Sequence, residues 1–368
     1  AAGSPAAAAG VFTRSRFAGP SVIVSREHLR DHRARAIVVV SKNANVATGR
    51  QGLADTRELV AGVAARLGCD ATDVIVASTG VIGRPYPMDR IRAGIERLPT
   101  GLGASGQHDD DGQRDDVDAA ARGIMTTDTV PKIATATVGA GPATVVGFAK
   151  GVGMIEPDMA TLIVVLLTDA AIEPEPLDRI LRSVIDRTLN CVSIDTDTST
   201  SDTAVVLASG AAGPVDHDAF ETALHEVALS LTKQVARDGE GAETLIEVHV
   251  DHARDHAQAK RVAKAIVNSP LVKTAVHGAD PNWGRVAMAI GKCSGDVDID
   301  PDRVVIRFGA TEVYPDLLDD DALAALSGYM AGDEVLIHVE LRTGTARATV
   351  WGCDLTDGYV RINADYTT

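Results

Sequence analysis

Aromatic residues and cysteines are scarce in this chain of 368 residues. Phe, Trp and Tyr together make up 3% of it, which argues against platforms that stack on nucleic-acid bases and requires a core of Ala, Val, Leu and Ile. The four cysteines, which are far apart and form no CxxC pair, are Cys69, Cys191, Cys293 and Cys353. They indicate reduced core thiols in a cytoplasmic protein; a catalytic cysteine with a distant histidine is the alternative.

Positive charge and long hydrophobic runs are also lacking. The chain has 35 Lys and Arg and 51 Asp and Glu, which gives a net charge of -16. Neither nucleic acid nor an anionic membrane is therefore expected as the main partner. No apolar run approaches the roughly 18 residues that a membrane-spanning helix needs. The apolar segment at 1–9 follows no basic segment, so we predict the flexible start of a longer chain rather than a signal peptide.

What remains is the composition of a globular protein, with 45% apolar and 23% charged residues. Apolar spacing predicts helices and strands in alternating runs. The predicted strands are 37–40, 74–77, 162–167, 245–250, 304–306, 335–337 and 348–351, with a hairpin over 135–146. The predicted helices are 55–67, capped by Asp55 with Glu58 in a capping box, and 177–185, 220–231, 255–267 and 322–330. This pattern predicts a mixed α/β (α+β) fold of stacked β-sheets flanked by helices.

Thr161 stands at the head of a predicted buried strand, behind a glycine-rich stretch at 150–154 and the sequence Pro-Asp-Met-Ala at 157–160. An enzyme can place a nucleophile at such a position. If the chain is cut between Ala160 and Thr161, the new amine, with an ordinary pKa of about 8, can take the proton of the threonine hydroxyl. The alternative is a threonine that merely begins a strand after a turn.

Short polar side chains gather in several further clusters, each of which alone is typical of turns and caps. These clusters are 77–83, 125–129, 193–202 and 238–241. The glycines at 80 and 83 lack the spacing of a dinucleotide-binding fingerprint, so a nucleotide-binding fold is not expected.

Two groups of residues have the composition of metal ligands. His108 to Asp111 lie in the loop 101–116, where a solvated acidic loop is the alternative to a cation site. His252 and His256 have the i,i+4 spacing of metal ligands on a helix, but no third ligand is evident. We therefore predict no metal site.

Taken together, the motifs at 77–83, 125–129, 150–161, 197–202, 238–242 and 277–285 resemble those of the ornithine acetyltransferases, or bifunctional glutamate N-acetyltransferases. The resemblance covers nearly the whole chain. It implies a self-cleaving acyltransferase with an N-terminal-nucleophile-like architecture, cut before Thr161 into chains 1–160 and 161–368. The second chain includes a smaller C-terminal subdomain, and the two stay folded together in units that we expect to form homo-oligomers.

The same resemblance implies the roles of individual residues. Thr161 is the nucleophile, and Thr79 with Gly80 forms the oxyanion hole. The substrate-binding residues implied are Thr126, Lys150, Thr161, Glu240, Asn363 and Thr368. A lysine and a glutamate suit an amino-acid substrate, because one pairs with a carboxylate and the other with an ammonium group.

The implied reaction is ping-pong: the acetyl group passes from N-acetylornithine to Thr161 and then to glutamate. No cofactor is needed. The alternatives are an N-terminal-nucleophile amidohydrolase or aminopeptidase, which would use water as acceptor, and an uncleaved binding protein without activity.

The chain departs from the usual family pattern in two places. Lys42 stands where members of the primary arginine pathway commonly carry glycine, and the run 11–20 is most similar to the paralogue of clavulanic-acid gene clusters. These features leave two settings for the reaction, arginine or clavulanic-acid-type metabolism, and an acceptor other than glutamate is an alternative.

Overall fold

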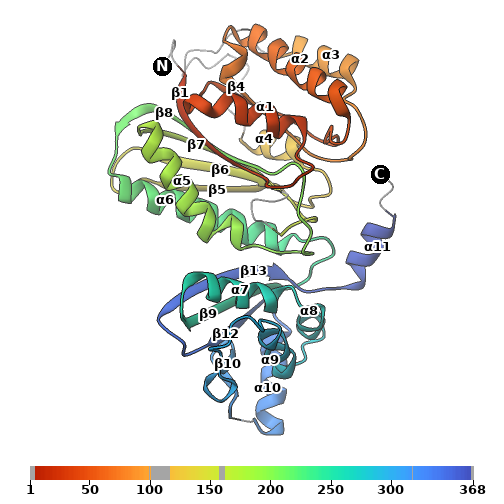
Figure 1. Cartoon of the computed structure of the whole chain (residues 1–368), viewed down its shortest axis with the longest axis vertical. Coiled ribbons are helices and arrows are strands. Elements are labelled where there is room, and N and C mark those ends of the chain that lie inside the picture. Colours follow the sequence, from red (N-terminus) through yellow and green to blue (C-terminus); the bar gives the residue numbers. More distant parts are fainter. Residues whose placement is uncertain (1–4, 99, 101–116, 157–161, 317, 366–368) are drawn as a thin grey trace.

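The computed structural model describes residues 5–98, 100, 117–156, 162–316 and 318–365. Within these residues, three β-sheets, of six, five and two strands, carry the fold; Figure 1 shows their arrangement. No helix in the described part of the chain is long and apolar enough to cross a membrane. All four cysteines are free: Cys191 and Cys353 are buried as predicted, whereas Cys69 and Cys293 are half-buried.

The six-stranded sheet forms the centre of the larger half of the molecule. In spatial order its strands are β2 (Arg33–Ala34), β1 (Ala6–Phe12), β8 (Thr203–Pro214), β7 (Ile163–Ala171), β6 (Thr144–Lys150) and β5 (Lys132–Thr137). β7 runs parallel to β8 and antiparallel to β6. Its apolar run is buried on both faces, since Val164 and Leu166 face one core and Ile163 and Val165 face the other. The predicted strand and the predicted hairpin of β5 and β6 are confirmed.

Layers of helices and a second sheet cover the six-stranded sheet. α5 (Pro174–Arg187) and α6 (His217–Arg237) lie on one face (Figure 1). On the other face lie the parallel strands β3 (Ala36–Val40) and β4 (Val74–Ser78), with α1 (Pro20–His28) and α4 (Val117–Ile124). Val74 and Val76 of β4 face outward to α2 (Gly49–Leu67), which packs on α3 (Met88–Glu96). The predicted stacked sheets flanked by helices are therefore present.

The C-terminal part forms a separate five-stranded sheet. Its strands, in spatial order, are β11 (Thr311–Tyr314), β10 (Val305–Phe308), β12 (Glu334–Glu340), β9 (Leu245–Ala253) and β13 (Ala346–Cys353). The helices of this part are α7 (His256–Val267), α8 (Pro270–His277), α9 (Trp283–Gly291), α10 (Asp320–Met330) and α11 (Asp357–Asp365). Val248 and Val250 of β9 face a core that includes Val262 and Ile266 of α7, so the alternate residues of β9 lie on the opposite face of the sheet.

Two local predictions are wrong. Asp55 does not cap a helix, because α2 begins at Gly49; its buried side chain instead accepts a hydrogen bond from Nε2 of Gln51, 2.7 Å away. The segment at 1–9 is not a flexible start throughout, because residues from Ala6 onward form β1, and Ala8 and Ala9 are fully buried.

Candidate active site

One cavity of about 390 Å³ gathers the predicted site residues that the structure describes. Those that line it are Thr79, Gly80, Thr126, Lys150, Glu240 and Asn363. They come from the end of β4, the turn after α4, the end of β6, the loop after α6 and helix α11, which follows the C-terminal sheet. Ser199, Thr200 and Ser201, from the polar cluster 193–202, complete one wall. Ala160, Thr161 and Thr368 lie outside the described residues.

Thr79 and Gly80 follow β4 directly and border the cavity. The backbone N–H of Thr79 donates to the carbonyl of Val40 at 3.0 Å, so a donor from Thr79 to a ligand has to be its hydroxyl group. Gly80 has a φ of 127°, and a Cβ there would lie 2.3 Å from the carbonyl carbon of Lys42. Only glycine fits this close approach of two backbone segments. The turn thus places a hydroxyl and a bare backbone side by side at the cavity wall.

Lys150, the last residue of β6, brings a buried cation to the cavity. It pairs in register with Ile163, so it lies beside the start of β7. Its side chain is 5% exposed, and its Nζ lies 3.8 Å from Oδ2 of Asp128. Burial lowers the pKa of Lys150, and Lys132 lowers it further, while Asp128 and Glu240 act in the opposite direction. A lysine that is held in so little water is well suited to bind a carboxylate.

Asp128 joins the turn after α4 to the glycine-rich loop. Its Oδ1 accepts hydrogen bonds from Nζ of Lys132 at 2.8 Å and from the N–H of Gly151 at 2.7 Å, and its Oδ2 accepts from the N–H of Thr126 at 3.0 Å. Lys132 also pairs with Asp238, 2.5 Å away. Burial alone would raise the pKa of Asp128, but the two lysines and these hydrogen bonds hold it below its ordinary value. The network fixes Thr126 and Lys150 relative to each other.

Glu240, in the polar turn 238–241, brings a charge opposite to that of Lys150 to the same cavity. Its Oε1 accepts from the hydroxyl of Thr127 at 3.1 Å and its Oε2 from Nδ2 of Asn363 at 2.9 Å. Gly153 leaves the room for this carboxylate, since a Cβ there would lie 2.5 Å from Oε2. A cationic Lys150 and an anionic Glu240 in one cavity complement the carboxylate and ammonium groups of an amino acid.

Two buried or half-buried carboxylates shape the site without having been predicted. Asp195 accepts from the N–H groups of Met154 and Ile155, at 2.6 and 2.8 Å, and so holds the glycine-rich loop. Oδ1 of Asp202 accepts from the N–H of Leu162 at 2.7 Å, whereas its Oδ2 is buried without a hydrogen-bond partner in the described structure. Burial raises the pKa of Asp202 well above its ordinary value, although the Leu162 N–H opposes this. Both lie in the cluster 193–202. The sequence feature that could have indicated them is an aspartate among Ser and Thr residues.

The suggested histidine pair does not form a metal site. Nδ1 of His252 lies 3.0 Å from Asp251, whereas Nδ1 of His256 lies 3.0 Å from the carbonyl of Arg347. Among the described residues, the groups of three close ligand atoms contain neither of these two histidines. The acidic residues 108–111 lie outside the part that the structure describes.

Comparison with known proteins agrees with the motifs. The model of the ArgJ family matches residues 1–368. The chain is 57% identical over 370 residues to "Glutamate N-acetyltransferase Oat2" of Streptomyces clavuligerus, covering 99% of this chain and 91% of that one. It is also 57% identical over 364 residues to "Arginine biosynthesis bifunctional protein ArgJ 2" of a Nostoc species, with the same coverage of both chains.

A solved structure extends this likeness to the fold. The crystal structure of the arginine biosynthesis bifunctional protein argJ from Bacillus halodurans is 39% identical to this chain, with a TM-score of 0.52. The match covers 55% of this chain and 98% of that one. The predicted family is confirmed, and the chain belongs to the ArgJ family.

Proposed function

We propose that this chain is a glutamate N-acetyltransferase that takes the acetyl group from N-acetylornithine and transfers it through Thr161. The observation that carries the proposal is the single cavity in which Lys150 and Glu240 supply opposite charges beside the hydroxyl of Thr79. Membership of the ArgJ family, and the name of the relative from Streptomyces clavuligerus, support the reaction type.

In the first half-reaction, the hydroxyl oxygen of Thr161 attacks the acetyl carbonyl and its proton passes to the amine of the same residue. The hydroxyl of Thr79 and the backbone of Gly80 stabilise the oxyanion. The C–N bond breaks, the leaving amine takes up the proton, and ornithine departs. The amino group of glutamate then attacks the acetyl ester and releases the threonine hydroxyl. Thr126, Asn363 and Thr368 complete the proposed binding site.

The proposal includes cleavage between Ala160 and Thr161 into chains 1–160 and 161–368. The strand order supports their continued association, because β7 and β8 of the second chain lie between β1 and β6 of the first. We further propose that the paired chains form homo-oligomers in the cytoplasm. The four free cysteines fit a reducing compartment.

The test is mass spectrometry of rapidly quenched, denatured protein. With N-acetylornithine alone, the chain that starts at Thr161 should gain one acetyl group, and later addition of glutamate should remove it. Thr161→Ala should remain one uncut chain without activity. Loss of the acetyl group at the same rate with and without glutamate would instead indicate an amidohydrolase. A single uncut band of the unaltered protein would indicate a binding protein.

A further inference from the structure

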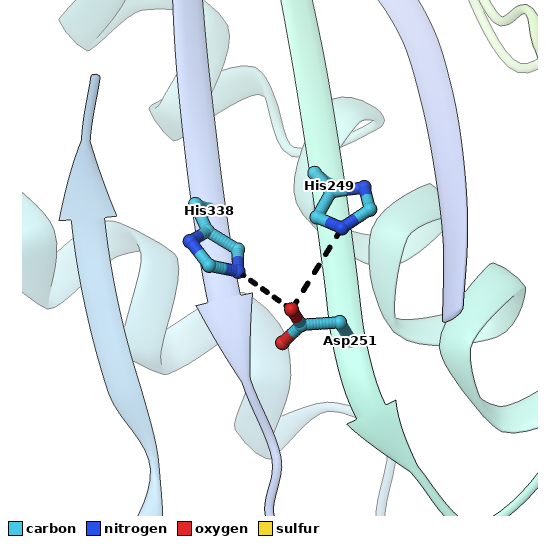
Figure 2. A group of neighbouring side chains, drawn as sticks. All are labelled: His249, Asp251 and His338. Atoms are coloured by element: carbon cyan, nitrogen blue, oxygen red, sulfur yellow. Dashed lines mark ion pairs between the residues drawn. The ribbon is translucent and has the colours of Figure 1, made fainter. Parts of the chain in front are cut away.

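A row of polar side chains crosses the C-terminal sheet on the face opposite the α7 core. In register, Thr349 of β13 lies beside His249 of β9, His249 beside His338 of β12, and His338 beside Arg307 of β10. Asp251 follows two residues after His249 on the same face of β9. Figure 2 shows both imidazole rings directed toward the carboxylate of Asp251.

The ligand atoms of this group are spaced for a small ion. Nε2 of His338 lies 3.1 Å and Nε2 of His249 lies 3.8 Å from the same oxygen of Asp251, and all three ligand atoms lie within 4.8 Å of one another. Tetrahedral Zn²⁺ with bonds of about 2.0–2.1 Å separates its ligand atoms by roughly 3.3 Å. The two distances to Asp251 bracket that value.

The hydrogen bonds around the two rings leave both Nε2 atoms directed at this point. Nδ1 of His249 lies 2.9 Å from the hydroxyl of Thr349, a second partner of the kind that orients metal-binding histidines. Nε2 of His338 is buried, and Oδ2 of Asp251 lies 3.1 Å away as its ion-pair partner.

Two cationic neighbours oppose a cation here: Arg347, whose charge acts on His249, and Arg307, which contacts His338. Nη1 of Arg307 lies 3.4 Å from Nδ1 of His338. However, its guanidinium group is paired with Glu340 at 2.6 Å and with Glu312 at 3.0 Å, so two carboxylates offset its charge. The long contact to the ring is the weakest of the three and the easiest to give up when Nδ1 has to carry the proton.

We propose that His249, Asp251 and His338 bind one divalent transition-metal ion, with Zn²⁺ as the best match, and leave a fourth position open to water or another ligand. Two imidazoles and one carboxylate suit Zn²⁺, whereas Mg²⁺ and Ca²⁺ prefer oxygen ligands. None of the three residues lines the acetyl-transfer cavity, so this site is independent of the proposed function.

Isothermal titration of the full-length, EDTA-stripped protein with ZnCl₂ tests the proposal. We expect one Zn²⁺ per chain and no comparable binding of Mg²⁺ or Ca²⁺. His249→Ala and His338→Ala should each weaken binding by more than about a hundredfold, and Thr349→Val, which removes only the orienting hydroxyl, by about tenfold. Both histidine side chains are partly exposed, at 29% and 22%, so we expect the variants to fold, and circular dichroism checks this.

His277→Ala is the matched control, because His277 belongs to the other group of three ligand atoms, with Glu243 and Asp354. It should leave zinc affinity unchanged. If a folded double variant of His249 and His338 binds zinc as tightly as the unaltered protein, the proposal is overturned. If the His277 variant alone loses binding, the ion belongs to that other group, and the proposal is overturned as well.

Discussion

Lys132, beside the cavity, and Lys233, on α6, both form ion pairs with two carboxylates, yet their surroundings differ completely. The side chain of Lys132 is fully buried, as is that of its partner Asp128. Lys233 pairs with Glu247 at 2.7 Å and with Glu334 at 3.7 Å but keeps 38% of its side chain exposed. The buried charges hold one arrangement because any other would leave a charge without a partner. By contrast, partly exposed side chains such as that of Lys233 can rearrange around a ligand.

The largest difference between the two regions should appear in stability. Lys132→Ala leaves two carboxylates without their shared partner in a buried site, so the free energy of unfolding should fall by about 3–5 kcal/mol. Lys233→Ala removes an exposed pair and should cost about 1 kcal/mol or less. Urea denaturation of both variants measures the contrast. Equal losses would show that the buried network does not hold the cavity together.

A second contrast concerns activity. Thr79→Ala removes the proposed side-chain oxyanion donor and should raise the barrier for acetyl transfer by about 2–4 kcal/mol, mostly through kcat. Thr311→Ala, at the start of β11, is the control from the C-terminal sheet and should leave turnover unchanged. Steady-state kinetics with N-acetylornithine and glutamate measure both. Normal turnover in the Thr79 variant would remove this residue from the proposed site.

The buried Asp202 predicts a pH dependence. Because its pKa is raised in the folded state, that state binds more protons than the unfolded chain, and stability falls as pH rises from the unfolded pKa toward the folded one. Asp202→Asn keeps an acceptor for the Leu162 N–H and abolishes the titration. The variant should therefore be more stable by about 1–3 kcal/mol at pH 7, and this gain should shrink as pH falls from the folded pKa and be absent below the unfolded pKa of about 4. Unfolding curves at several pH values check this, and a gain that is independent of pH would contradict it.

The smallest predicted effect concerns space in the cavity. In Gly153→Ala the new Cβ would lie 2.5 Å from the carboxylate of Glu240 and displace it, which should lower kcat/KM by about tenfold to a hundredfold. Gly123→Ala is the control, because a Cβ there has no atom within 4 Å. An unchanged kcat/KM in the first variant would mean that the exact position of Glu240 matters little.

The sequence predicted the elements better than the contacts between them. The strands at 74–77 and 162–167 and the helices of the core follow from apolar spacing, which records burial directly. The predicted cap at Asp55 was wrong because a capping pattern can also occur inside a helix. The pattern alone therefore does not fix where the helix begins. The alanines of β1 carry no periodic signal, and their place in the sheet depends on pairing with β8, nearly 200 residues away.

For the cavity, only the family motifs linked positions as distant as Thr126 and Asn363. No sequence pattern predicts that Asp128 binds Lys132 and the Gly151 N–H, because these contacts arise from tertiary packing. Likewise, the alternation of His249 and Asp251 was visible, but the proximity of His338 depends on the register of β9 with β12. Lys42 has a φ of 69°, a backbone conformation that favours glycine, and no local pattern around this residue indicated it.

In the six-stranded sheet, strands from after position 160 lie between strands from before it. This arrangement affects how the protein can refold once it has unfolded. Under the proposed cleavage, a denatured molecule has to regain its fold by a second-order reaction between two polypeptides, so recovery depends on concentration. Their encounter carries an entropic cost of about 4–15 kcal/mol that the newly synthesised single chain never meets. Persistence of the mature protein then depends on slow unfolding, and new synthesis has to replace each molecule that does unfold.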